Sequence, residues 1–331
     1  MKRILALGGA GFIGSYVVRE LLASGYHVKV VDNFSKYGTL RHEFFDHPNF
    51  ELEVKDVRNL YPRDFRGYDI VLCLAALIGG IRYFHKIPYR IARDNTELLT
   101  HAIDATLAAA PDALFVYFSS SMVYERMNRP VTESDALAQP VPLTNYGMQK
   151  LFGEFLTRGA REEFDLNYLI VRPFNAVGSG ELPEMRSDGT VDFGMAHVIP
   201  DFVYKTLVRQ TPFEIFGDGE QVRTFTHARD IASGLRQLLA TDIRNDDFNF
   251  CGDNTLKMRD LAERIWSRIN PELSFPDVLS MPVPPSDVRF RIGTSLKATE
   301  RFGWKPSCNL DYIIDDTSHY IASRMRDVVR L

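Results

Sequence analysis

The chain has 331 residues, of which 45% are hydrophobic and 25% charged, and its formal net charge is −4. This is an ordinary globular composition, and it excludes disordered and fibrous classes. Basic residues are spread along the sequence, so nucleic acid is not expected as a partner. No segment approaches the length of a membrane span. Three widely spaced cysteines, Cys73, Cys251 and Cys308, favour a reducing, cytoplasmic location.

Short apolar runs alternate with helical stretches through the first half of the chain. Runs that are apolar on both faces and separated by helices are typical of a parallel sheet covered by helices on each side. The expected strands are Ile4 to Leu7, Val28 to Val31, Ile70 to Leu74, Leu114 to Phe118 and Tyr168 to Val171. The sequence therefore predicts an α/β fold with a Rossmann-type, doubly wound parallel sheet.

The composition changes after residue 175. Residues 178–196 are rich in Gly, Ser, Pro, Asp and Glu, which is typical of a long surface loop or lid. We expect residues 1–175, with about 220–252 returning, to form the sheet domain, and residues 176–331 to form a smaller, mixed substrate domain. Their cleft would hold a ligand. In the second half, helices are expected at 261–269 and 312–323 and strands at 213–216 and 248–250.

A glycine-rich turn follows the first strand directly and opens the first helix. It runs Gly8-Gly9-Ala10-Gly11-Phe12-Ile13-Gly14. Glycines there let the backbone turn tightly and approach a pyrophosphate held on helix N-terminal amides. The second strand ends in Asp32-Asn33, and a carboxylate at this place binds ribose hydroxyls and repels a 2′-phosphate. The sequence thus predicts a site for NAD rather than NADP, the alternative being a glycine-rich turn with an Asp that caps a loop.

Tyr146 and Lys150 lie four residues apart on a predicted helix, so both side chains share one face. A phenol titrates near ~10 in water, and a neighbouring cation stabilises its phenolate. Lys150 would supply that cation and also hold the nicotinamide ribose. The strand at 114–118 places Ser119-Ser120-Ser121 at its carboxyl end, where open parallel sheets bind ligands. A serine there can hold the reacting oxygen of a substrate, or it can cap a helix.

Together these motifs resemble the extended short-chain dehydrogenase/reductase family, in its branch of nucleotide-sugar epimerases and reductases. The likeness covers nearly the whole chain. Beyond the residues above, it rests on Lys55-Asp56-Val57, Leu74-Ala75-Ala76, Asp94-Asn95, Ser119 to Tyr124, Arg172-Pro173-Phe174-Asn175, His197-Val198-Ile199-Pro200, Phe216 to Gly219, Arg223 to His227 and Gly303 to Pro306.

The resemblance implies roles for particular residues. Ser120, four before Tyr124, would be the catalytic hydroxyl beside Tyr146 and Lys150. The arginines would hold a diphosphate through paired hydrogen bonds, or else pair with surface charges. No metal is expected. Further cofactor contacts would be Asp56, Val57, Leu74, Ala75, Ala76, Asn95 and Pro173. Substrate contacts would be Ser121, Asn175, His197, Val198, Arg223 and one or both of Arg289 and Arg291.

The choice of reaction depends on the residues after Ser120. In the 4,6-dehydratases an Asp-Glu pair follows the catalytic hydroxyl, whereas this chain has Ser121 and Met122. In the 3,5-epimerases and in GDP-fucose synthase a cysteine occupies the place of Met122, and a thioether cannot move protons. The segments 74–81 and 197–200 do resemble the fucose synthase group, which uses NADPH and in which the histidine is an acid.

We therefore expect an NAD-dependent epimerase that removes and returns a hydride, at C4 of a nucleotide-diphosphate sugar. The alternatives are an NAD(P)H-dependent keto-sugar reductase or dehydrogenase, and a dinucleotide-sensing protein without turnover. His197 is a candidate substrate ligand, proton donor or helix-cap neighbour, and the acidic residues of the 178–196 loop are candidates for further chemistry. Helices at 95–110 and 146–161 pair between subunits in the family, so a homodimer is expected.

Overall fold

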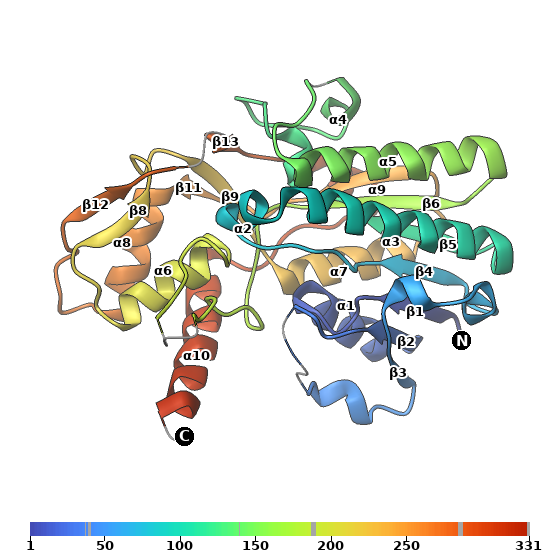
Figure 1. Cartoon of the computed structure of the whole chain (residues 1–331), viewed down its shortest axis with the longest axis horizontal. Helices are drawn as coiled ribbons and strands as arrows, with labels where there is room; N and C mark the ends of the chain where they lie inside the picture. Colours follow the sequence, from blue (N-terminus) through green and yellow to red (C-terminus); the bar gives the residue numbers. More distant parts are fainter. Residues whose placement is uncertain (37, 39–40, 139, 187–189, 284–286, 330–331) are drawn as a thin grey trace.

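A seven-stranded parallel sheet forms the centre of the larger part of the molecule (Figure 1). The computed structural model describes residues 1–331 except 37, 39–40, 139, 187–189, 284–286 and 330–331. The strands are β1 (Arg3–Leu7), β2 (His27–Asp32), β3 (Phe50–Val54), β4 (Ile70–Cys73), β5 (Leu114–Phe118), β6 (Tyr168–Pro173) and β10 (Asp246–Phe250). They lie in the order β10-β6-β5-β4-β1-β2-β3, and every neighbouring pair is parallel. The predicted Rossmann-type sheet is confirmed.

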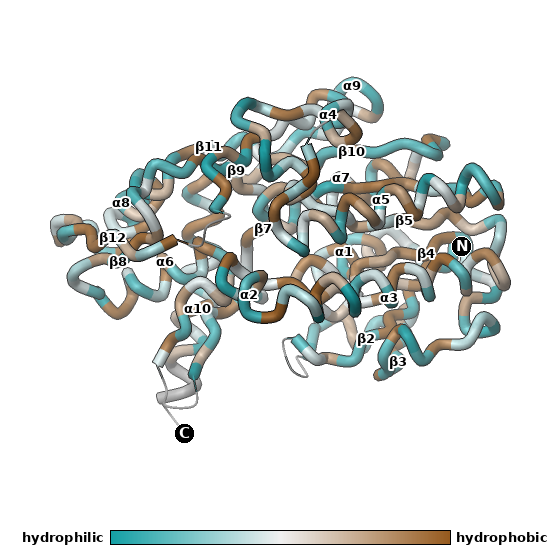
Figure 2. The backbone as a smooth tube through the Cα atoms, turned by 45° about the horizontal axis from the view of Figure 1, so that its top comes forward, coloured by the Kyte–Doolittle hydropathy of each residue, from teal (hydrophilic) through white to brown (hydrophobic). Residues whose placement is uncertain are grey.

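Helices cover both faces of this sheet. On one face α1 (Phe12–Ala23) packs against α7 (Ala228–Leu239), and on the other α3 (Pro88–Ala109) packs against α5 (Asn145–Phe164). Successive residues of a strand enter opposite cores, because side chains alternate across a sheet. In β1, for example, Ile4 belongs to one core and Leu5 to the other. Figure 2 shows hydrophobic colour along the central strands and hydrophilic colour in the outer turns. Because both faces of the sheet are buried, its inner strands are mostly apolar, and this continuous apolar signal allowed them to be predicted from the sequence.

Strand β3 was not predicted, and its position explains why. It lies at the edge of the sheet beside β2, and its sequence alternates Phe50, Glu51, Leu52, Glu53 and Val54. Edge strands carry charged residues that central strands exclude. Here Glu53 forms an ion pair of 2.7 Å with Lys29 of the neighbouring strand. A run with two glutamates lacks the continuous apolar signal of the other strands.

The smaller part of the molecule has its own core, formed largely by three helices. In its sheets β9 pairs with β7, β11 and β13, and β8 pairs with β12. The helices are α6 (Val198–Leu207), α8 (Met258–Ile269) and α10 (Leu310–Val329). The strands are β7 (Ala176–Val177), β8 (Phe213–Phe216), β9 (Val222–His227), β11 (Asn254–Lys257), β12 (Val278–Met281) and β13 (Phe290–Arg291). The chain returns to the large sheet through α7 and β10, whereas β9 stays in the small sheet.

The remaining elements are short and lie around these two parts. They are α2 (Ile81–Lys86), α4 (Asp135–Ala138), α9 (Leu296–Phe302) and the single-turn helices η1 (Glu43–Asp46), η2 (Val57–Asn59), η3 (Pro62–Phe65) and η4 (Ser121–Tyr124). The described residues of 178–196 form a loop with one isolated bridge, between Met185 and Val191, as the composition predicted. Among the described residues, no helix combines the length and the apolar character needed to cross a bilayer.

Candidate active site

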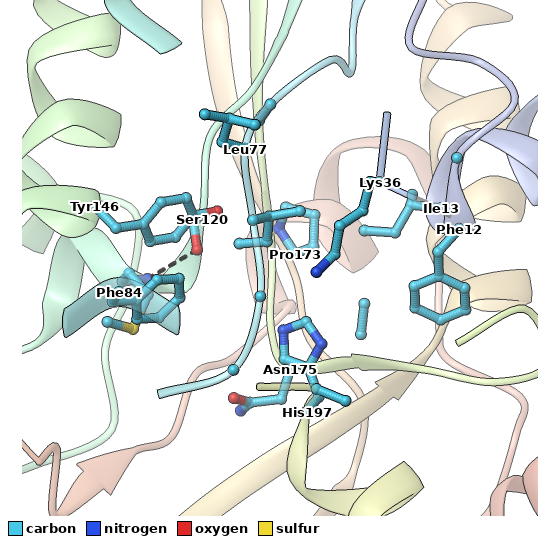
Figure 3. Close-up of a pocket in the computed structure, with 18 of the residues that line it drawn as sticks. Phe12, Ile13, Lys36, Leu77, Phe84, Ser120, Tyr146, Pro173, Asn175 and His197 are labelled. Atoms are coloured by element: carbon cyan, nitrogen blue, oxygen red, sulfur yellow. Dashed lines mark hydrogen bonds between the residues drawn. The ribbon is translucent and has the colours of Figure 1, made fainter. Parts of the chain in front are cut away.

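A cavity of about 480 Å³ lies at the carboxyl edge of the large sheet, where the smaller part meets it. In Figure 3, Ser120 and Tyr146 stand on one side of it, Phe12 and Ile13 on the other, and Asn175 and His197 below. Of the residues to which the sequence analysis gave a catalytic, cofactor or substrate role, Arg289 is not part of its lining. The others all line it: Gly8, Gly11, Phe12, Ile13, Gly14, Asp32, Asn33, Asp56, Val57, Leu74, Ala75, Ala76, Asn95, Ser120, Ser121, Tyr146, Lys150, Pro173, Asn175, His197, Val198, Arg223 and Arg291.

The turn from β1 into α1 has room for backbone only. Gly8 has a φ of +82°, and a Cβ there would lie 2.5 Å from the Cα of Ala75. A Cβ on Gly14 would lie 2.5 Å from the carbonyl oxygen of Gly8. The N-cap residue of α1, Gly11, has no side chain to occupy the first amides of the helix. A helix N-terminus with free amides attracts anions, so this turn fits the pyrophosphate of a dinucleotide.

Asp32 is held rigidly at the end of β2. Its two carboxylate oxygens accept hydrogen bonds from the backbone amides of Ala10, at 3.0 Å, and Phe34, at 2.9 Å. Each carboxylate oxygen has a second lone pair, so both can still accept from ribose hydroxyls. The negative charge beside the glycine turn disfavours a 2′-phosphate. The position therefore fits NAD better than NADP.

The carboxylate of Asp56, a predicted cofactor contact, is largely occupied by hydrogen bonds from other residues of the protein. Its carboxylate accepts from the side chain of Arg58 at 3.0 and 2.8 Å and from Asn33 at 3.2 Å. The paired hydrogen bond to Arg58 is the main reason why the pKa of Asp56 falls to about 2. Arg58 also lines the cavity but was missed, because nothing in its sequence position distinguishes it from a surface arginine.

Asn95 acts on the cavity through the loop after β4. Its side-chain amide accepts from the backbone N–H of Leu77 at 2.7 Å and donates to the carbonyl of Leu77 at 3.1 Å. This pair of hydrogen bonds fixes the segment that begins with Leu74, Ala75 and Ala76, all of which line the cavity. Asn95 therefore shapes the predicted cofactor site by holding its backbone.

Ser120 and Tyr146 meet at the carboxyl end of β5. The Ser120 hydroxyl lowers the pKa of Tyr146, and Ser120 also caps the short helix η4 by accepting from the N–H of Met122 at 3.2 Å. The Tyr146 ring is buried and stacks on Phe84 of α2, with ring centroids 4.7 Å apart. Phe84 was missed because an aromatic residue on a helix normally belongs to the hydrophobic core. A serine and a tyrosine in contact can hold and deprotonate one alcohol.

The sequence predicted that Lys150 lowers the pKa of Tyr146, but in the structure other groups have this effect. Burial raises the pKa of Tyr146 above its usual value, and the groups that oppose this shift are the Ser120 hydroxyl and the charge of Arg291. The Lys150 ammonium instead donates to the carbonyl of Phe118 at 2.7 Å and lies 5.8 Å from the centroid of the Tyr146 ring. Burial lowers the pKa of Lys150 to about 8. Helical spacing placed both groups on one face, but it did not fix the direction of the flexible lysine.

Two arginines line the cavity, and the protein supplies too few negative charges beside them to neutralise both. Burial and, next, the charge of Arg291 lower the pKa of Arg223 to about 9, while Asp287, 3.6 Å away, opposes the shift. Arg291 donates to Asn175 at 2.8 Å, but its Nε has no hydrogen-bond partner within the described part of the chain. Two guanidinium groups that repel each other in a buried site fit a diphosphate, which would neutralise both.

Arg289 does not belong to this group. Its guanidinium forms hydrogen bonds of 2.8 and 2.9 Å with both oxygens of Asp218, and both side chains are about half exposed. Arg289 and Arg291 are two residues apart at the start of β13, yet only Arg291 lines the cavity. Arg289 therefore fits the alternative given in the sequence analysis, that it pairs with a surface charge.

His197 occupies the N-cap position of α6, but its side chain makes no capping hydrogen bond. Instead its Nδ1 lies 2.6 Å from Oε1 of Glu181, which is buried in the 178–196 loop. Burial would lower the pKa of His197, but the charge and hydrogen bond of Glu181 together raise it. Glu181 and the nearby Asp201 of α6 were not singled out individually. For Glu181, the only signal in the sequence was the acidic composition of the 178–196 loop.

The 178–196 loop also closes the cavity against α2. The N–H of Gly80 donates to the carbonyl of Met195 at 2.7 Å, and the N–H of Arg82 donates to the carbonyl of Gly194 at 2.9 Å. A Cβ on Gly80 would lie 2.0 Å from the carbonyl oxygen of Ala196. This contact, which we call the roof, therefore joins the segment after β4 to the segment before His197.

Comparison with known proteins gives consistent results. Residues 4–251 match the family described as the NAD dependent epimerase/dehydratase family. GDP-mannose 3,5-epimerase 1 of Oryza sativa subsp. japonica is 27% identical over 313 residues, which cover 93% of this chain and 78% of the relative. The structure is similar to UDP-glucuronic acid 4-epimerase from Bacillus cereus in complex with UDP-glucuronic acid and NAD, with a TM-score of 0.84, 26% identity and coverage of 97% and 99%. It is also similar to UDP-glucose 4-epimerase of Thermotoga maritima with UDP-glucose, with a TM-score of 0.82, 26% identity and 99% coverage of both chains.

Proposed function

This chain belongs to the NAD dependent epimerase/dehydratase family, and we propose that it is an NAD-dependent nucleotide-sugar epimerase that inverts C4 of the sugar. The two similar solved structures named above are UDP-sugar 4-epimerases, one of them with NAD bound. Asp32 supports NAD as the dinucleotide, because its charge faces the place of a 2′-phosphate.

The observation that carries this proposal is the arrangement of three features along one cavity. The glycine turn after β1, the side chains of Ser120 and Tyr146, and the arginines Arg223 and Arg291 all line it. A nucleotide sugar needs all three, because its diphosphate must be anchored while one carbon of the sugar reaches both the hydroxyl groups and the dinucleotide. Asn175 links the two arginine positions, since it accepts from Arg291 at 2.8 Å and donates to the carbonyl of Thr224, next to Arg223, at 2.7 Å.

The chemistry of the chain's own residues follows from these contacts. Ser120 holds the C4 hydroxyl of the sugar, and Tyr146 takes the proton from the hydroxyl oxygen and later returns it. NAD, when bound at the glycine turn, supplies hydride acceptance and return. The charge of Arg291 and the Ser120 hydrogen bond favour ionisation of Tyr146, against burial. Lys150 holds the nicotinamide ribose, and Arg223 and Arg291 hold the diphosphate while the keto sugar turns over.

The proposal is tested by identifying the dinucleotide and the product. The purified protein is denatured and the released NAD(H) is identified, and the native protein is then incubated with UDP-, GDP-, dTDP- and CDP-sugars. NMR of the products is expected to show a C4 epimer with no net consumption of added NADH. Stoichiometric consumption of NAD(P)H with a keto sugar would instead identify the chain as a reductase.

The exposed face of α5 supports a homodimer. Met148, Phe152 and Phe155 are 45%, 48% and 54% exposed and follow one another at helical spacing. Such an apolar stripe is normally covered by another surface. We propose that α3 and α5 pack against their copies in a second subunit. Size-exclusion chromatography with light scattering is expected to give a dimer, and a Phe152→Glu, Phe155→Glu variant a monomer. A monomeric wild type would contradict the proposal.

A further inference from the structure

One buried carboxylate fixes both the backbone and the ring of His197. Glu181 is 2% exposed, and its Oε1 accepts from the N–H of His197 at 3.2 Å while lying 2.6 Å from Nδ1 of the ring. A rotation of the imidazole would break the shorter of these contacts. The ring is therefore fixed in orientation by a residue 16 positions earlier in the chain.

The second ring nitrogen of His197 is the one that faces the cavity. Because Nδ1 is engaged by Glu181, it carries the proton of that hydrogen bond. The His197 side chain is 32% exposed and lines the cavity. Figure 3 shows the ring standing inside the cavity between Pro173 and Asn175. When the ring is an imidazolium, Nε2 also carries a proton and points a charged donor at the substrate site.

Asp201, one turn into α6, is a second buried carboxyl group that senses the charge of Glu181. It is 4% exposed, and its Oδ2 accepts from the N–H of Gly194 at 2.6 Å. Its other oxygen, Oδ1, and Oε2 of Glu181 are both buried with no hydrogen-bond partner in the described ranges. Burial raises the pKa of Asp201 to about 7, and the charge of Glu181 contributes to that rise. A proton on Asp201 removes the repulsion between two buried carboxylates.

We propose that Glu181 and Asp201 are positioning residues that keep His197 as an imidazolium, with its Nε2–H bound to an oxygen acceptor of the substrate. Asp201 acts by taking up a proton, so that Glu181 keeps its negative charge beside the ring. The inference rests on the proposed function, since it takes a nucleotide sugar as the ligand. The acceptor is a phosphate oxygen or a sugar hydroxyl, and the two are separated by using ligands with and without the sugar.

The dependence on pH follows from the groups around the ring. Glu181 favours the imidazolium, whereas Lys36 and Arg291 disfavour it. Because Glu181 raises the pKa of His197, the imidazolium and its hydrogen bond persist to higher pH and are lost as the pH rises through that value. A neutral glutamine at 181 removes this support. The affinity lost in Glu181→Gln is therefore expected to be largest where the wild-type ring is still charged and the variant ring is not, and to shrink as acid protonates the variant ring as well.

The experiment compares isosteric variants of the holoenzyme. For Glu181→Gln, we expect Kd for UDP or GDP, or KM for the sugar nucleotide, to rise by about tenfold near neutral pH and by less at acid pH, with little change in kcat. Asp201→Asn keeps a neutral group of the same shape and is expected to match the wild type at pH 6, whereas Asp201→Ala, which also removes the acceptor for the N–H of Gly194, is expected to lose part of the affinity. Glu184→Gln, in the same loop, is the matched control. A loss with UDP or GDP identifies phosphate as the acceptor, and a loss only with the sugar nucleotide identifies a sugar hydroxyl.

A direct readout separates this inference from the proposed function. NMR titration of the His197 ring in histidine-labelled protein is expected to give a lower pKa in Glu181→Gln than in the wild type, with or without turnover. If both the titration and the pH dependence of affinity are unchanged in Glu181→Gln, the inference is wrong. If no sugar nucleotide is epimerised, the proposed function fails while the titration still decides the role of Glu181.

Discussion

The two walls of the cavity are built in different ways. The cofactor wall, which we define as Gly8 to Gly14, Asp32 and Leu74 to Ala76, is built from short runs of consecutive residues, and at Gly8 and Gly14 the packing leaves no room for a side chain. The substrate wall, which we define as Asn175, His197, Arg223 and Arg291, with Glu181 bonded to His197, consists of side chains from loops and from strands β9 and β13. Where the backbone is packed this closely, few substitutions are tolerated. A site made of side chains can change its ligand specificity by single substitutions.

The charges of the two walls also differ. Asp32 accepts two backbone hydrogen bonds, and nearby Asp56 is paired with Arg58, so the acids on the cofactor side have partners. On the substrate side, burial and the charge of Arg291 lower the pKa of Arg223, and Asp287 opposes this shift only in part. The substrate wall is therefore incomplete until an anion binds. This difference leads to four predictions.

The largest effect is expected where the walls meet. In Tyr146→Phe the group that exchanges a proton with the substrate hydroxyl is lost, and kcat should fall by about 10²–10⁴-fold. The dinucleotide content and the melting temperature should stay close to wild type, since the ring still stacks on Phe84. Tyr124→Phe is the control, because Tyr124 donates to Asn249 at 3.0 Å and does not line the cavity. A Tyr146→Phe enzyme with a tenth or more of wild-type turnover would rule out the proposed mechanism.

The substrate wall is tested by two arginines close in space and different in surroundings. Arg223→Ala removes a buried charged donor, and KM for the nucleotide sugar should rise by about 10–100-fold. Arg289→Ala removes only a surface ion pair with Asp218, so its kinetics and its stability should match the wild type. Steady-state kinetics of both variants decide the point. Equal effects of the two substitutions would mean that burial does not identify the phosphate site.

The cofactor wall is tested by adding one methyl group. Gly14→Ala places a Cβ 2.5 Å from the carbonyl oxygen of Gly8, so the turn must shift and NAD affinity should fall on the order of tenfold. Gly159→Ala, in α5, meets no atom within 4 Å and should bind NAD normally. Titration of dinucleotide-free protein with NAD measures both. Unchanged affinity in Gly14→Ala would show that the turn is more adaptable than its packing indicates.

The last prediction concerns stability rather than binding or turnover, and it is a pH dependence due to Lys150. Burial lowers its pKa to about 8 from the ordinary value of 10.5, so between these values the unfolded chain holds a proton that the folded chain has lost. Stability should therefore rise with pH in this window relative to Lys150→Met, by at most about 1.4 kcal/mol per pH unit. Denaturant unfolding of both dinucleotide-free proteins from pH 8 to 10.5 gives the difference. A constant difference would mean that Lys150 titrates normally.

The cofactor wall could be predicted from the sequence because its signals are local. A strand, a glycine turn and a helix follow one another within Arg3 to Ala23, and each element constrains the next. The same is true of Tyr146 and Lys150, which helical spacing places on one face. Even there, the spacing did not predict that the lysine would turn to Phe118 and leave Arg291 as the cation that acts on Tyr146.

The substrate wall could be predicted only in part because its contacts are distant in sequence. Arg223 and Arg291 were found through motifs, but the sequence could not separate Arg291 from Arg289, whose position depends on how β13 meets β9. Glu181 lies in a loop without periodicity, so its contact with His197 follows from tertiary packing alone. Phe84 was missed for a similar reason, since stacking on Tyr146 depends on where α2 lies.

The roof has a consequence for the lifetime of the complex. Its two backbone hydrogen bonds, from Gly80 and Arg82 to the carbonyls of Met195 and Gly194, tie the segment after the cofactor wall to the segment before His197. Under the proposed mechanism an oxidised sugar would lie in the cavity beside them, so contacts that persist through the cycle should leave few catalytic cycles abandoned halfway. Hydrogen–deuterium exchange at these two amides would then report how often the enclosure opens, and that frequency would set an upper limit on the rate at which finished sugar departs.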